Sequence, residues 1–178
     1  HGRIACVNAL IAAKAEIEAK DGNGNTVLMC AATYGHIACV NALMEAEAKL
    51  EAKDKNDNTA LILAARNSHT DCVVALLDAG ADVNASNEYG NTALIWAARN
   101  GHTNCVNALI AAGAEKEAKD KNDNTALIVA AINGHTNCVN ALIEAGADLN
   151  ATDEEGDTAL ILAATKGSID CVVALLDA

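Results

Sequence analysis

The residues whose types and spacing could do chemistry are four histidines, each followed three positions later by a cysteine. The pairs are His36 and Cys39, His69 and Cys72, His102 and Cys105, and His135 and Cys138. On a helix, this spacing places both side chains on one face, where imidazole and thiolate could bind a metal ion. The same pair could also act as a nucleophile and its base.

Neither chemistry fits the distribution of the pairs. A structural zinc ion needs four ligands, whereas each pair lies 33 positions from the next. Ser168 stands at the histidine position before Cys171, so the last copy lacks the pair. A catalytic pair copied into every unit would serve no purpose, and no glycine-rich oxyanion-binding element accompanies it. We therefore predict a structural role for both residue types, with no catalytic residue, metal site or cofactor.

The pairs recur because the whole sequence repeats. The segment 91–114, NTALIWAARNGHTNCVNALIAAGA, begins with Asn91 and has counterparts at a spacing of 33 residues. The matching first residues are Asn25, Asn58, Asn124 and Asp157. Two short apolar segments and a polar connector at this period are typical of a stacked solenoid. We predict a partial repeat at 1–20, full repeats at 21–53, 54–86, 87–119 and 120–152, and a last repeat at 153–178.

Each repeat is expected to contain two short helices. In the third full repeat, the Thr92 hydroxyl can cap a first helix that ends near Gly101, and the second helix carries Cys105 and Leu109 on one apolar face. Helices this short are unstable alone, so the repeats must gain stability by stacking on one another. The polar stretch 117–124 predicts a turn or β-hairpin that projects from the stack.

Composition limits the classes of partner. Apolar residues make up 52% of the chain, but Phe and Pro are absent, so small aliphatic side chains and cysteines must build the core. The formal net charge is −12, which disfavours nucleic acid and anionic membranes as partners. A protein with a basic or mixed surface is favoured instead, although the same charge could simply serve solubility.

The cysteines indicate a cellular location. Six of the seven occupy the same repeat position: Cys6, Cys39, Cys72, Cys105, Cys138 and Cys171. Equivalent atoms of stacked helices lie roughly 8–10 Å apart, too far for a disulfide, so we expect free thiols. A buried thiol in each repeat fits a reducing compartment. Together with the absence of a recognisable signal peptide or membrane-spanning run, this predicts an intracellular, cytoplasmic protein.

The repeat resembles that of the ankyrin repeat family along the whole chain. In the third full repeat, the matching residues are Gly90, Thr92, Leu94, Ala97, Ala98, Gly101, His102, Val106, Leu109, Ile110, Gly113 and Ala114. The resemblance implies a single domain over 1–178 with an all-α repeat solenoid fold, built from helix-turn-helix repeats with projecting β-hairpin or turn fingers. It also implies a non-catalytic module for protein-protein interaction.

Departures from the family pattern are informative. The family's Pro after the capping Thr is absent, and its His is replaced by Ile or Met, as at Ile95. Asp57 occupies a position where the finger usually has a glycine. Lys14 and Glu47 replace the glycine that ends the second helix, which predicts that the first two repeats are the least regular and least stable.

By resemblance, a partner would contact the finger tips and the concave face of the first helices. The positions carried over are Gly22, Asn23, Asn25, Thr33, Tyr34, Lys55, Asn56, Asn58, Arg66, Asn67, Glu88, Tyr89, Asn91, Arg99, Asn100, Lys121, Asn122, Asn124, Ile132, Asn133, Glu154, Glu155, Asp157, Thr165 and Lys166. Interfaces draw most of their energy from a few Trp, Tyr and Arg residues. We therefore predict a centre at Tyr89, Trp96, Arg99 and Arg66. Trp96 could instead fill core space.

Two other readings remain open. The chain could be a structural spacer or an internal segment of a longer array, because neither terminal repeat has the polar substitutions of a cap. Exposed Val7, Leu10, Val173 and Leu176 would then favour end-to-end self-association. Near-identical segments, such as 51–62 and 117–128, would also suit an engineered, consensus-like scaffold.

Overall fold

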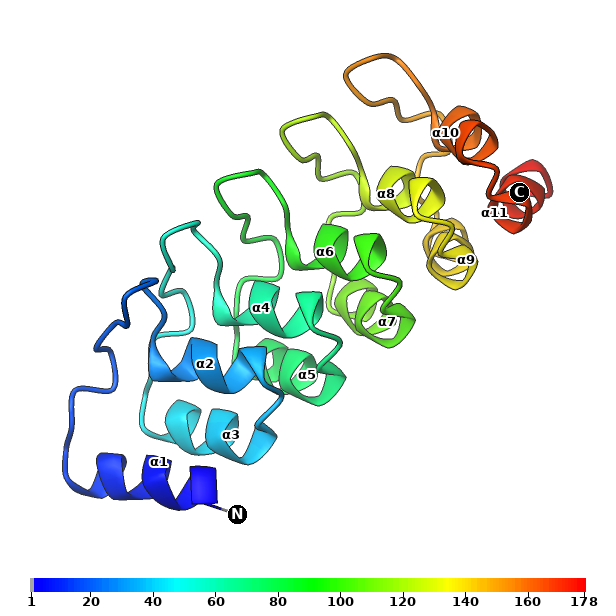
Figure 1. Ribbon diagram of the computed structural model, residues 1–178. Helices are drawn as coiled ribbons and strands as arrows, with labels where there is room; N and C mark the ends of the chain where they lie inside the picture. Colours follow the sequence, from blue (N-terminus) through cyan, green and yellow to red (C-terminus); the bar gives the residue numbers. More distant parts are fainter. Residues whose placement is uncertain (1) are drawn as a thin grey trace.

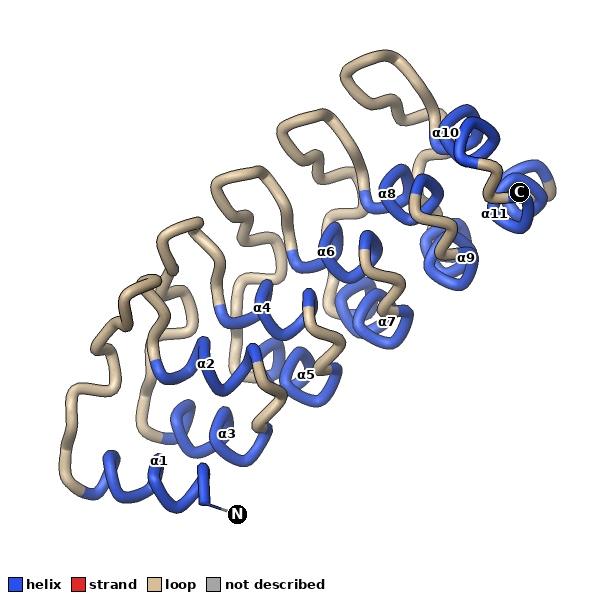
Figure 2. Tube along the Cα trace, in the orientation of Figure 1, coloured by secondary structure: helices blue, strands red, loops and turns tan. Residues whose placement is uncertain are grey.

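The computed structural model describes the backbone of residues 2–178 and the side chains of residues 4–178; His1, in the predicted partial repeat, lies outside this range. Within it the chain forms two parallel rows of short helices, with loops that project to one side (Figures 1 and 2). The inner row, beside the loops, contains α2 (Val27–Thr33), α4 (Ala60–Arg66), α6 (Ala93–Arg99), α8 (Ala126–Ile132) and α10 (Ala159–Lys166). The outer row contains α1 (Gly2–Ala12), α3 (Ile37–Glu45), α5 (Thr70–Asp78), α7 (Thr103–Ala111), α9 (Thr136–Glu144) and α11 (Ile169–Leu176).

A threonine starts every inner helix, as predicted. In α6 the Thr92 hydroxyl accepts a hydrogen bond from the Ile95 amide at 3.3 Å. This bond satisfies one of the free amides of the first turn. The same bond is made by Thr26, Thr59, Thr125 and Thr158. The inner helices therefore begin at equivalent residues and stack in register.

The core is one continuous layer between the two rows. Leu94 and Ile95 of α6 and Leu109 of α7 are each almost completely buried, together with their equivalents in the neighbouring repeats. Alanines such as Ala97 fill the remaining contacts between inner helices, so these helices can pack closely. No described helix is long and apolar enough to cross a lipid bilayer.

The repeated histidines link each repeat to the one before it. His135 Nε2 lies 3.0 Å from the carbonyl oxygen of Arg99, and His69 and His102 make the same contact to Thr33 and Arg66. A carbonyl can only accept, so Nε2 is the donor in each case. These histidines therefore have a structural role in the stack.

In each loop between helical pairs, a side-chain carboxylate or amide at the base accepts backbone hydrogen bonds that fix the turn. We call the segments 21–25, 54–58, 87–91, 120–124 and 153–157 the fingers. In the fourth finger, Asp120 Oδ1 accepts the backbone amides of Asn122 and Asn124 at 2.9 and 3.0 Å. Isolated bridges join Ser86 to Thr92 and Thr152 to Thr158, but the described residues contain no strand, so the fingers are turns rather than hairpins.

Successive fingers are hydrogen-bonded to each other through their backbones. The Glu88 amide donates to Asn56 O at 3.0 Å, and the Lys121 amide donates to Tyr89 O at 3.0 Å. Equivalent bonds join Lys55 to Asn23 and Glu154 to Asn122. The finger row is therefore one connected edge rather than a set of independent loops.

The departures from the family pattern lie at left-handed backbone positions. Lys14 has a φ of 52°, Glu47 of 60° and Asp57 of 61°, all in the region that glycine adopts most easily. Ser68, with a φ of 65°, is a further residue in this left-handed region. It occupies the turn position that Gly101 holds in the next repeat.

Two expectations for the first helix are wrong. Val7 is buried rather than exposed, because it packs into the core against α3. Cys6 is exposed, so a buried thiol is not present in every repeat. Leu10, Val173 and Leu176 are exposed as predicted.

Candidate functional site

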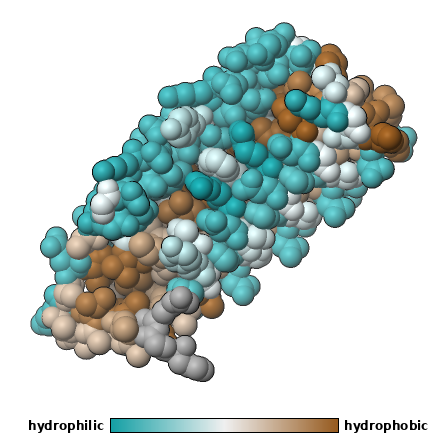
Figure 3. Space-filling view, viewed as in Figure 1, coloured by the Kyte–Doolittle hydropathy of each residue, from teal (hydrophilic) through white to brown (hydrophobic). Residues whose placement is uncertain are grey.

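A hollow of about 420 Å³ lies where the fingers meet the inner helices in the middle of the stack. It is lined by Asn56, Asn58, Arg66, Asn87, Tyr89, Asn91, Trp96, Arg99, Asp120, Lys121 and Asn122. These residues come from three successive repeats. Hydrophilic side chains cover the middle of the face seen in Figure 3, whereas apolar surface gathers toward the two ends.

Trp96 lies on α6 in the wall of this hollow. The Arg66 guanidinium lies 5.0 Å from the centre of its ring and the Arg99 guanidinium 5.5 Å away, both within the range of cation-π attraction. Part of the ring packs against the core, and part stays accessible. Trp96 therefore fills core space in part and is also accessible in part, and its contact with a partner stays a prediction.

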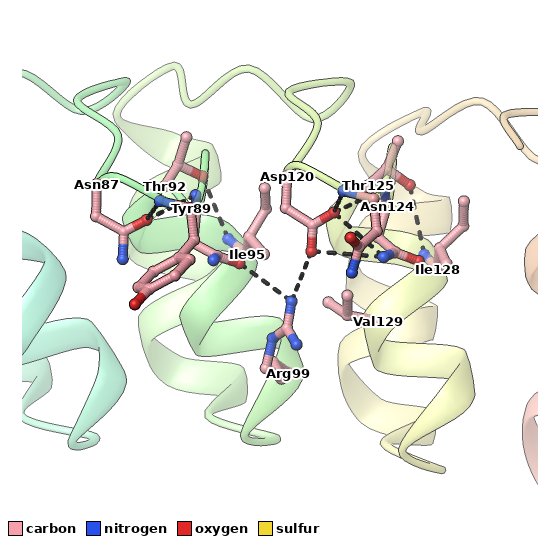
Figure 4. A network of polar contacts seen from close by, with 12 residues as sticks. Asn87, Tyr89, Thr92, Ile95, Arg99, Asp120, Asn124, Thr125, Ile128 and Val129 are labelled. Atoms are coloured by element: carbon pink, nitrogen blue, oxygen red, sulfur yellow. Dashed lines mark hydrogen bonds and ion pairs between the residues drawn. The ribbon is translucent and has the colours of Figure 1, made fainter. Parts of the chain in front are cut away.

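Arg99 is fixed by the finger of the following repeat (Figure 4). One of its terminal nitrogens donates to Asp120 Oδ2 at 2.8 Å and to Asn91 Oδ1 at 3.1 Å. The Asp120 side chain is only 5% exposed, so this ion pair is largely shielded from water. Arg99 thus joins α6 to the next finger, and its charge is already neutralised.

The other two cations of the hollow have no acidic partner in the described part of the chain. Arg66 is exposed, and its guanidinium makes no hydrogen bond or ion pair there. The Lys121 ammonium lies 5.8 Å from the centre of the Tyr89 ring. The neighbouring Glu88 carboxylate, as a hydrogen-bond acceptor and a negative charge, raises the pKa of the Tyr89 hydroxyl. The hollow therefore contains three cations and one carboxylate, in a chain whose net charge is −12.

Nine of the predicted contact positions line this hollow: Asn56, Asn58, Arg66, Tyr89, Asn91, Trp96, Arg99, Lys121 and Asn122. The other predicted positions do not line it, among them Tyr34, Lys55, Asn67, Glu88, Asn100, Ile132 and Asn133. Tyr34 is exposed in the repeat at 21–53, and the centre of its ring lies 6.1 Å from that of His36.

Several of these positions are occupied by structural contacts. The Asn67 and Asn133 amides donate to carbonyls one turn back, at Leu63 and Val129. Asn58 and Asn91, predicted as contact residues, are more than nine-tenths buried, because their side chains brace the bases of the fingers.

Two residues of the hollow were not among the predicted contacts. Asn87 and Asp120 are the first residues of their fingers, and in the sequence they look like ordinary turn formers. The signal that could have found Asp120 is its charge, which is opposite to that of Arg99. The two residues are 21 positions apart, and only the stacking geometry brings them together.

The buried thiols of the middle repeats are structural rather than reactive. Burial raises the pKa of the Cys72 thiol to about 11 and also raises the pKa values of Cys105 and Cys138. The Thr103 hydroxyl of the preceding outer helix lies 3.4 Å from Cys138 Sγ. All seven cysteines are free, and the described residues contain no cluster of three His, Cys, Asp or Glu side chains that could hold a metal ion.

The comparison with curated proteins found no match. A family model described as ankyrin repeats (3 copies) matches residues 1–87, 52–120 and 113–178. Such repeats generally mediate protein-protein interaction, and the family is typically non-catalytic. These matches span the sequence from end to end, and the structure shows the paired helices and fingers that the pattern requires, so the chain belongs to the ankyrin repeat family.

Proposed function

We propose that the chain is a non-catalytic protein-binding module that contacts its partner through the finger tips and the inner helices, with the hollow around Trp96 at the centre. The observation that carries this proposal is the grouping of Trp96, Tyr89 and Arg66 in one hollow. Side chains of these types dominate the energetics of protein interfaces, especially when they cluster near the middle.

The fold does not require a tryptophan at position 96. Leu63 and Val129 occupy the positions equivalent to Trp96 in the flanking repeats, and both are buried core residues. An aliphatic residue therefore satisfies the stack at this position. Trp96 is larger, less buried and flanked by two guanidinium groups, which supports a role in contact with a partner.

The fingers are suited to binding because they are already ordered. Backbone hydrogen bonds join each described finger to the next, and Arg99 ties the fourth finger to α6. A surface that is organised before binding loses less conformational entropy when the partner docks. The row of fingers and inner helices is also long enough to supply roughly 800 Å² to a partner, as standard interfaces require.

The proposal is tested by capturing proteins from a cell lysate on the immobilised chain and on a variant with Tyr89→Ala and Arg66→Ala. We expect captured proteins to be lost from the double variant, because both side chains are exposed and make few internal contacts. Tyr34→Ala combined with Lys166→Ala is the matched control, since it removes an exposed tyrosine and a cation on an inner helix outside the hollow. Equal capture by all three proteins would refute the proposed centre.

A second candidate function, end-to-end association with another copy, is favoured by the apolar surface of the last repeat. Ile161 is 46% exposed, whereas its equivalent Ile128 is covered by α10 and fully buried. Val173 and Leu176 are exposed on α11. A second copy stacked on this face would bury these side chains in the way that successive repeats bury one another. Light scattering should then show dimers or larger species that dissociate in Leu176→Lys, and a monomer at all concentrations would exclude this function.

A further inference from the structure

We infer that the hollow binds an acidic side chain, Asp or Glu, in an extended segment of the partner protein. This inference rests on the proposed function and specifies the chemistry of the partner at its centre. The chain as a whole is strongly acidic and on that basis favours a basic or mixed partner surface. The residues that line the hollow carry a positive net charge, opposite to that of the whole chain. We therefore expect a partner surface with charges of both signs and a carboxylate at the point that enters the hollow.

The first argument is the balance of charge among the lining residues. Asp120 neutralises Arg99 at 2.8 Å, but no carboxylate pairs with Arg66 or Lys121 within the described residues. Two cations without acidic partners therefore line a hollow that is partly shielded from solvent. A carboxylate from a partner would gain charge-assisted hydrogen bonds there, and Arg66 can bind it through two nitrogens.

The second argument concerns the aromatic rings, which would otherwise attract a cation. Two guanidinium groups already lie within 5.5 Å of the Trp96 ring centre, and Lys121 lies 5.8 Å from that of Tyr89. A lysine or arginine from a partner would have to displace these cations and would be repelled by them. The rings therefore hold the cations in place for an anion rather than forming a cage for a cation.

The third argument is the hydrogen-bonding capacity of the two unpaired cations. Within the described residues, neither the Arg66 guanidinium nor the Lys121 ammonium makes a hydrogen bond or ion pair. Both groups can only donate, and a carboxylate can only accept. An acidic side chain therefore complements the bonding capacity of these two groups.

A carboxylate fits this hollow better than a phosphate. Asp120 forms part of the wall, and Glu88 is next to Tyr89 in the same finger. A phosphate, with a charge near −2, would be repelled by these carboxylates more strongly than a side-chain carboxylate with a single charge. A phosphorylated segment is therefore an alternative that the experiment must separate from an acidic one.

The test selects peptides from a random dodecapeptide library displayed on phage, with the chain immobilised. The selection is done at 150 mM salt, where the Debye length is ~8 Å. We expect Asp and Glu to exceed Lys and Arg in the selected peptides, against the overall negative charge of the chain. Labelled copies of these peptides are then titrated by fluorescence anisotropy. Arg66→Gln should weaken binding about tenfold and Lys121→Gln a few-fold, in line with loss of interface charge contacts.

Matched variants make the outcome specific. Lys49→Gln removes one exposed positive charge outside the fingers, the inner helices and the hollow, and should leave binding unchanged. Neutral or basic peptides that still require Tyr89 would overturn the acidic-partner inference and leave the proposed function standing. If neither Tyr89→Ala nor Arg66→Gln changed the affinity of the selected peptides, or if no sequence were selected, the inference and the proposed function would both be refuted. Tighter binding after a phosphoserine replaces the critical Glu would identify phosphate, not carboxylate, as the ligand group.

Discussion

The repeats at 87–119 and 120–152 have the same frame but different surfaces. Leu94 and Leu127 are equally buried on their inner helices, and the same Thr cap begins both helices. Yet Trp96 faces the hollow where the next repeat has buried Val129. The difference teaches that stacking requires only part of each inner helix, so the remaining positions are free to vary without loss of the fold.

The largest effect is expected from damage to the shared frame. Leu94→Ala and Leu127→Ala should each lower the free energy of unfolding by about 3 kcal/mol, because each leaves a cavity in the core. Urea denaturation followed by circular dichroism measures both. The two losses should agree to within about 1 kcal/mol if the frames are equivalent. A larger difference would mean that the repeats contribute unequally to the stack.

The frame was accessible from the sequence because its rules are local and repeated. The threonine caps and the structural role of the histidines follow from residue type and spacing, and the structure confirms them. The left-handed conformation of Asp57 is consistent with the glycine that the family usually has at that position. The burial of Val7 was missed because it depends on how α1 packs against α3, which no local pattern specifies.

The hollow was only partly accessible from the sequence. Tyr89, Trp96, Arg99 and Arg66 stood out by residue type, and all four line the hollow. The ion pair of Arg99 did not stand out, because its partner Asp120 belongs to the next repeat and meets it only through stacking. For the same reason, the sequence predicted the negative net charge of the whole chain but not the positive net charge of the residues that line the hollow.

A smaller effect should separate the turns that follow the two inner helices. Gly101 and Gly134 have φ values of 73° and 71°, so alanine at either position costs about 1 kcal/mol in backbone strain. A Cβ on Gly101 would lie 2.6 Å from His135 Nδ1, whereas a Cβ on Gly134 would lie 3.3 Å from Ser168 Oγ. Gly101→Ala should therefore cost about 2 kcal/mol, since it also displaces the His135 ring from its hydrogen bond to Arg99 O.

The cause of that difference can be checked directly. In a chain that already carries His135→Ser, adding Gly101→Ala should lower the free energy of unfolding by only about 1 kcal/mol, as Gly134→Ala does in the unmodified chain. Thermal and urea unfolding of the unmodified chain, the two single variants at positions 101 and 135 and their double variant would measure the coupling. Equal costs for the two glycines in the unmodified chain would show that the histidine ring does not constrain the turn.

The smallest effect should come from replacing Arg99 by the residue that the next repeat has in its place, Ile132. Asp120 is nearly buried, so loss of its ion pair could leave an uncompensated charge at a cost of several kcal/mol. However, Asp120 also accepts two backbone amides, as Asp153 does in the last finger, where no arginine stands at the equivalent position. Arg99→Ile should therefore reduce stability by only about 1 kcal/mol. A loss above about 3 kcal/mol in urea denaturation would show that Arg99 belongs to the frame rather than to the variable surface.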